Sequence, residues 1–230
     1  MKEIRTTFYE LRSYFVPGGV LLWTILEMLD LCGYEPTTHV ISTLSSSFKA
    51  ILFIIISYVI GHGLHIVANY TIDKLPFASY PPKDYFDERF AQDFSKETID
   101  ALFKSIVAML GIQKAEAANV KEIVRNAYWV CFQYVMNRQN VETENFLGLT
   151  GFYRGITSAM MLTFVMYSVA FIRFHESQLG IISLFAFFMG GLFLTRVRRF
   201  NYYLVKTVYA NFLNCYAEKS SNKVEVPEQA

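Results

Sequence analysis

The chain has 230 residues, with 21 Lys and Arg against 20 Asp and Glu, so its formal net charge is +1 at pH 7. A charge this close to zero excludes a global basic field of the kind that attracts nucleic acid. Charged residues make up 18% of the chain and hydrophobic residues 53%, whereas about a quarter of a typical soluble domain is charged. The composition therefore favours a membrane protein.

Four apolar stretches are long enough to cross a bilayer as helices. They are residues 15–31, 50–69, 155–172 and 179–197. A membrane-spanning helix needs roughly 20 mostly apolar residues. The first stretch lacks the small-residue pattern of a cleavage site, so we expect it to remain in the protein.

The Lys and Arg residues lie almost entirely on one side of these stretches. All but Lys49 and Arg173 fall in the N-terminal flank, in residues 70–154, or after residue 194. Connections on the cytoplasmic side of a membrane carry an excess of Lys and Arg. We therefore expect both termini and the long middle segment to be cytoplasmic.

The predicted fold is all-α, a four-helix transmembrane bundle with a helical cytoplasmic domain. The expected parts are an interfacial helix and the first two transmembrane helices in 1–69, a cytoplasmic loop and helices in 70–154, transmembrane helices three and four in 155–197, a cytoplasmic helical extension in 198–219, and a disordered tail in 220–230. In the middle segment, apolar residues at three- and four-residue steps predict helices over 96–110 and 116–138. We also expect residues 144–154 to extend the third span inward, and the fourth span to continue to about Glu218.

Glu27 and Asp30 are carboxylates within or at the end of the first span. Their spacing of three places them on one helix face. Ionised groups inside a membrane usually face a bundle interior or a water-filled path, and a ring of them around an oligomer axis is a feature of cation pores. The alternative is that both residues mark the outer boundary of the span.

His62 and His65 share a face near the inner end of the second span, in the segment GHGLH. We predict a pore or gating role for them, with protonation as the switch. Hydrogen bonding to a neighbouring helix is the structural alternative. A zinc site would need further ligands, and none is evident, so we expect no metal. By depth, these histidines should meet Pro17, Gly18 and Gly19 of the first span, with Gly61 and Gly63 allowing a close approach.

Two groups of basic residues are candidate anion-binding sites on the inner side. The first combines cations with aromatic rings, a mixture that can hold phosphates and stack bases; its residues are Arg196, Arg198, Arg199 and Tyr203. Its structural alternative is a stop-transfer cluster with an interfacial aromatic belt. The second group is Lys121 and Arg125, for which a solvated helix face is the alternative.

Catalytic motifs are absent from the sequence. It contains neither a GxxxxGK[ST] phosphate loop nor a G-x-S-x-G nucleophile elbow. The three cysteines, Cys32, Cys131 and Cys215, are widely spaced and form no CxxC pair, so metal or redox use has little support. We therefore expect no catalytic residue, no cofactor and no enzymatic activity.

The segment FYELRSYFVPGGVLLW is followed by YVIGHGLH at residues 58–65. This arrangement resembles small multi-span bacterial membrane proteins of antiphage defence, which pair a Pro-Gly at the first span with a Gly-His in the second. The resemblance covers residues 1–70. It implies a multi-pass protein of the bacterial inner membrane that oligomerises and changes membrane permeability when a signal arrives.

Together these features predict an oligomeric membrane effector, a signal-gated channel or a membrane-disrupting protein. A four-span monomer is too small to enclose a wide path, so we expect a homo-oligomer, a trimer or tetramer, in contact with membrane lipid. The signal would be a nucleotide, a short nucleic acid or a companion cytosolic protein. The alternatives are a membrane-embedded enzyme using His62 and His65, and a membrane anchor or sensor scaffold for a cytosolic partner.

Overall fold

The computed structural model describes residues 11–34, 45–75, 89–111 and 120–222, apart from the side chains of 120, 121 and 218–222. Within these ranges every regular element is a helix. The chain divides into two compact units, residues 1–79 with 148–199 and residues 80–147 with 200–230. We call them unit 1 and unit 2.

Unit 1 contains the apolar helices. Its elements are the π-helix η1 (Leu11–Phe15), α2 (Val16–Leu31), α4 (Ser46–Tyr70), the short η2 (Ile72–Lys74), and the apolar parts of α10 (Val141–Phe174) and α11 (Ser177–Asn222). Four helices are long and apolar enough to cross a membrane, which confirms the four predicted stretches. Pro17 lies in the first turn of α2, where its missing N–H breaks no helical hydrogen bond.

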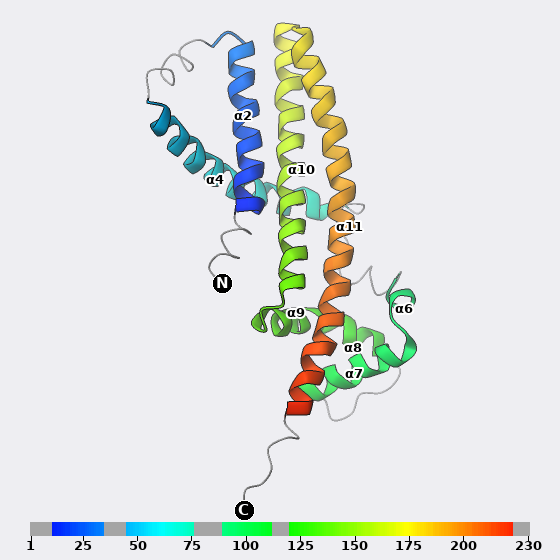
Figure 1. Ribbon diagram of the computed structural model, residues 1–230. Coiled ribbons are helices and arrows are strands. Elements are labelled where there is room, and N and C mark those ends of the chain that lie inside the picture. Colours follow the sequence, from blue (N-terminus) through cyan, green and yellow to red (C-terminus); the bar gives the residue numbers. More distant parts are fainter. Residues whose placement is uncertain (1–10, 35–44, 76–88, 112–119, 223–230) are drawn as a thin grey trace, which may run out of the picture. The chain divides into compact units, whose positions relative to one another are not determined.

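Both predicted helix extensions are confirmed. The third apolar stretch belongs to a helix that is continuous from Val141, and the fourth belongs to one that runs on to Asn222. Figure 1 shows these two helices as an antiparallel pair joined by a tight connection. A hydrogen bond between the hydroxyls of Ser168 and Ser183, 2.7 Å apart, joins α10 to α11 near that connection.

α4 runs obliquely across unit 1 (Figure 1). It crosses α2 near Gly18 and ends against α11, where Ala68 and Ile72 pack on Val197. At the centre of the unit, Leu21, Leu64 and Ala159 bring α2, α4 and α10 together.

Unit 2 is built around an aromatic core. Its helices are α6 (Phe90–Asp93), α7 (Lys96–Leu110), α8 (Val120–Asn126), α9 (Tyr128–Asn137), the start of α10 and the last part of α11. Among the described residues of unit 2, the largest fully buried side chains are Phe90, Tyr209 and Phe212. The Tyr209 hydroxyl donates a 3.1 Å hydrogen bond to the carbonyl of Val124, so this buried polar group is hydrogen-bonded.

One helix prediction in unit 2 is confirmed and one is wrong in detail. α7 has the predicted bounds, because Ser95 caps its first turn and Gly111, at φ 67°, ends it. The helix expected over 116–138 is two helices among the described residues, α8 and α9, which are separated at Ala127, where ψ is −3°. Residues 1–10 of the predicted interfacial helix, the loop 76–88 and residues 223–230 of the predicted tail 220–230 lie outside the described residues. The prediction of disorder is wrong for residues 220–222, which are the last residues of α11.

Candidate functional site

One face of α2 is exposed along its length. The exposed residues are Val16, Trp23, Glu27 and Asp30, and we call them the α2 stripe. Steps of seven, four and three residues place them on a single side of the helix. The opposite side carries the buried Gly18 and Leu21, so the stripe is the side of α2 that the described residues of unit 1 leave exposed.

The two carboxylates of the α2 stripe lie near one end of the helix. α2 ends at Leu31, with Cys32 as its cap. Leu31 and Cys32 pack against a cluster formed by Tyr167 and Ala170 of α10 and Leu179 of the first turn of α11. Asp30 is thus in the last turn of α2, and Glu27 is one turn deeper, about 4.5 Å along the axis.

His62 and His65 lie in an aromatic cluster with η1. The His62 ring stacks on Tyr14, with centroids 4.1 Å apart and planes at 16°, and Tyr58 meets His62 edge-on at 4.7 Å. Nε2 of His65 lies 3.0 Å from the backbone oxygen of Ser13. His65 is therefore within hydrogen-bonding distance of the neighbouring helix η1, as the structural alternative to a gating role requires.

The expected contact between the two Gly-containing segments is confirmed. A Cβ at Gly61 would fall on the backbone carbonyl of Tyr14, and a Cβ at Gly18 would fall on that of Ser57. The prediction for Gly63 is wrong, because that residue is exposed and a Cβ there would meet nothing within 4 Å. It lies about 200° around the helix from Gly61, since each residue turns a helix by about 100°.

Arg154 forms an ion pair that the sequence analysis missed. Its guanidinium is 2.6 Å from the Asp73 carboxylate and also donates to the side chain of Asn69. Arg154 is far from Asp73 in sequence, so the ion pair joins α10 to η2, and the contact with Asn69 joins α10 to the last turn of α4. A signal was present, since each residue flanks an apolar stretch on the side predicted to be internal.

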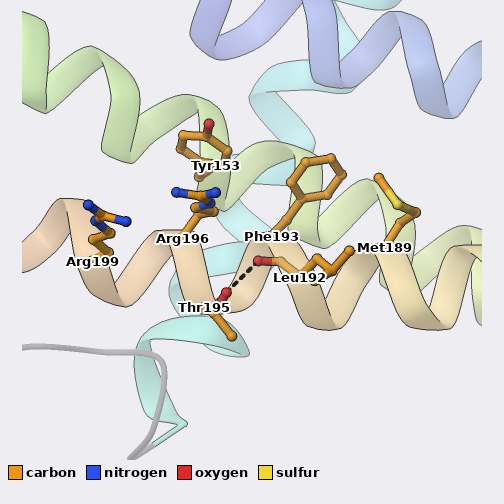
Figure 2. A pocket seen from close by; sticks show the side chains of 7 residues that line it. All are labelled: Tyr153, Met189, Leu192, Phe193, Thr195, Arg196 and Arg199. Atoms are coloured by element: carbon orange, nitrogen blue, oxygen red, sulfur yellow. Dashed lines mark hydrogen bonds between the residues drawn. The ribbon is translucent and has the colours of Figure 1, made fainter.

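Some of the predicted anion-binding residues come together. Arg196 and Arg199 line an open groove of about 680 Å³ whose other residues are Tyr153, Met189, Leu192, Phe193 and Thr195. We call it the α11 groove (Figure 2). Arg198 is exposed but does not line it.

The remaining predicted anion ligands are elsewhere. Tyr203 belongs to unit 2, where its ring stacks on Phe146 with centroids 5.8 Å apart. Arg125 lies 3.9 Å from Glu122 on the same helix, as in an ordinary surface pair. The side chain of Lys121 is outside the described residues.

Comparisons with known proteins and tests for metal sites add no further assignment. No protein-family model, curated protein or solved structure matches the chain. Among the described residues, no group of three or more His, Cys, Asp or Glu could hold a metal ion. Any functional conclusion therefore depends on the α2 stripe, the histidine cluster and the α11 groove.

Proposed function

We propose that the chain is an integral membrane protein that forms a homo-oligomer and carries cations across the bilayer. In this proposal the α2 stripe faces neighbouring copies, and Glu27 lies beside the path of the ion. Unit 2 is the cytoplasmic part that receives the activating signal, which is a nucleotide, a short nucleic acid or a companion protein. Antiphage defence is the proposed biological setting.

The exposure of Glu27 is the observation that carries the proposal. An ionised carboxylate in hydrocarbon costs several kcal/mol, and Glu27 is exposed in the part of unit 1 that the structure describes. Trp23, on the same stripe, is 61% exposed. A second copy packed on this face would remove Glu27 from lipid and bury the indole of Trp23.

A ring of Glu27 carboxylates, one from each copy, would also make the path selective for cations. Identical copies around a closed symmetry axis would place one Glu27 per subunit at the same depth. Such a ring attracts cations and repels anions. Asp30, one turn closer to the end of the helix, would extend the negative region to the mouth of the path.

Ion flux from proteoliposomes tests this proposal. We expect Glu27→Gln to lower potassium flux by about tenfold, because it removes one charge per subunit from the path. Liposomes are tested alone and with nucleotides or short oligonucleotides added. Glu176→Gln is the matched control, since Glu176 is exposed in the α10–α11 connection and outside the α2 stripe.

Two results would contradict the proposal that the chain conducts cations past Glu27. One is equal flux from Glu27→Gln and the parent chain. The other is the absence of flux under every addition although the protein is correctly inserted, which would favour the membrane-anchor alternative.

A further inference from the structure

The α11 groove changes in polarity along its length. Its residues on α11 are, in order, Met189, Leu192, Phe193, Thr195, Arg196 and Arg199. Met189, Leu192, Phe193, Arg196 and Arg199 lie on one broad helix face, because Met189 is three or four residues from Leu192 and Phe193, and Arg196 is three or four residues from Phe193 and Leu192 and three from Arg199. The first three are apolar and the last two are cationic, over about 15 Å of helix. Figure 2 shows the two guanidinium groups at one end and Met189 at the other.

The apolar end of the groove belongs to the membrane-spanning part of α11. Met189 and Phe193 are half-buried against Ile156 and Met160 of α10, whereas Leu192 is 60% exposed. An exposed leucine is stable beside lipid but unfavourable beside water. This end of the groove is therefore suited to an acyl chain.

The cationic end lies where the apolar stretch of α11 stops. Arg196 and Arg199 are exposed and three residues apart, so both can reach one anion. Tyr153 of α10 forms the wall beside Arg196 (Figure 2). Guanidinium groups bind phosphate through paired hydrogen bonds, and basic pockets at this depth in membrane proteins hold anionic headgroups.

We propose that the α11 groove binds one anionic phospholipid, with its phosphate on Arg196 and Arg199 and an acyl chain along Leu192 and Met189. A free phosphate or nucleotide would contact only the cationic half of the groove, whereas a phospholipid matches both halves. The inference rests on the membrane insertion proposed above, but not on oligomer formation or conduction. A protein that carries no ion would bind the lipid equally well.

Native mass spectrometry of the detergent-purified full chain tests the cationic end. We compare adducts of phosphatidylglycerol and phosphatidylcholine on the parent, on Arg196→Gln/Arg199→Gln, and on the charge-matched control Arg173→Gln/Arg198→Gln. We expect the parent and the control to prefer phosphatidylglycerol. The groove variant should bind it at least tenfold more weakly, because charge-assisted hydrogen bonds to the phosphate are lost.

A second pair of variants tests the apolar end. Leu192→Glu should weaken phosphatidylglycerol binding, whereas Leu184→Glu, on an exposed residue outside the groove, should not. Glycerol 3-phosphate at millimolar concentration should not displace the lipid. Thermal unfolding of each variant shows that the fold is retained, as expected for substitutions at exposed side chains.

Several outcomes would overturn the proposal. Equal loss of phosphatidylglycerol from the two arginine double variants would show that only total charge matters. Equal binding of the two lipids by the parent would remove the role of the headgroup charge. Unchanged binding by Leu192→Glu, or displacement by glycerol 3-phosphate, would reduce the groove to a simple anion site.

Discussion

At the residue scale, two glycines determine how closely α2 and α4 approach. Gly18 of α2 faces the α4 backbone at Ser57, and Gly61 of α4 faces the backbone of Tyr14 in η1, which leads into α2; neither glycine has room for a side chain. Close contact between helices inside a membrane depends on such small residues, because lipid is as apolar as leucine and supplies no hydrophobic driving force. Their effect is therefore on packing geometry.

Gly61→Ala should destabilise unit 1, while Gly63→Ala should not. The new methyl group at residue 61 overlaps the Tyr14 carbonyl, and overpacking of this kind costs about 1–3 kcal/mol. Fluorescence of Trp23 during thermal unfolding in detergent, in a Trp129→Phe background, measures the change. Equal melting temperatures for the two alanine variants would show that the helices separate easily.

The buried thiol of Cys131 should make unit 2 less stable as the pH rises above about 9. Burial raises the pKa of this thiol from 9.0 to about 12, and burial raises the pKa of Tyr128 in the same direction. Well below pH 9 the thiol is protonated in both the folded and the unfolded chain. As pH rises from 9 towards 12, the unfolded chain loses the proton and the folded chain keeps it, so the free energy of unfolding falls.

The measurement is denaturant unfolding at pH 8, 9.5 and 10.5, with Trp129 as the probe in a Trp23→Phe background. We expect Cys131→Ala to flatten the decrease above pH 9. The thiol should also resist alkylation at pH 8 until the chain unfolds, whereas the half-buried Cys215 should react sooner. Rapid labelling of native Cys131 would contradict its burial.

At the element scale, polar contacts attach short segments to long helices. Asp93, at the end of α6, accepts a 2.6 Å hydrogen bond from the Tyr202 hydroxyl and pairs with Lys206 at 3.0 Å. Only four residues form α6, too few for a helix that is stable by itself. These contacts to α11, together with the burial of Phe90, hold α6 in place.

Asp93→Asn should release α6 from α11 and cost about 1–3 kcal/mol, because Tyr202 and Lys206 lose a charged acceptor. Limited proteolysis around Arg89 should become faster. Asp100→Asn is the control, since Asp100 is exposed on α7. If cleavage is equally fast in both variants, the Asp93 contacts do not hold α6.

At the scale of the whole molecule, the large exposed apolar residues gather on the helices of unit 1. They include Ile51, Ile54, Ile55 and Val59 on α4, Val165, Val169 and Ile172 on α10, and Ile181, Leu184, Phe185 and Phe188 on α11. A surface of this kind promotes aggregation in water and is stable in a bilayer. The carboxylates of the α2 stripe interrupt it, which is why we assign that face to contact between copies.

Cysteine cross-linking in membranes tests the assignment. In a chain whose three native cysteines are replaced by serine, Trp23→Cys should form disulfide-linked dimers on mild oxidation, because the same residue from two copies approaches across a subunit contact. Val169→Cys is the matched control. Val169 is 63% exposed, like Trp23, but lies on α10, so this variant should remain monomeric. Cross-linking only through residue 169 would place the contact on α10 instead.

The four apolar stretches, the continuation of the third and fourth helices beyond their apolar stretches and the bounds of α7 could be predicted from the sequence. Each depends on local properties, namely the length of an apolar run, the spacing of apolar residues, and caps such as Ser95 and Gly111. The break at Ala127 could not be predicted, because no Gly or Pro marks it.

The contacts between helices were decided only by the tertiary structure. It determined that Glu27 shares an exposed stripe with Trp23, that Arg154 pairs with Asp73, and that Arg196 and Arg199 share a groove with apolar residues while Arg198 does not. Such groupings depend on how each helix is rotated and crossed against its neighbours. That geometry arises from packing between residues far apart in the chain, as at Gly18 and Gly61, and no local pattern encodes it.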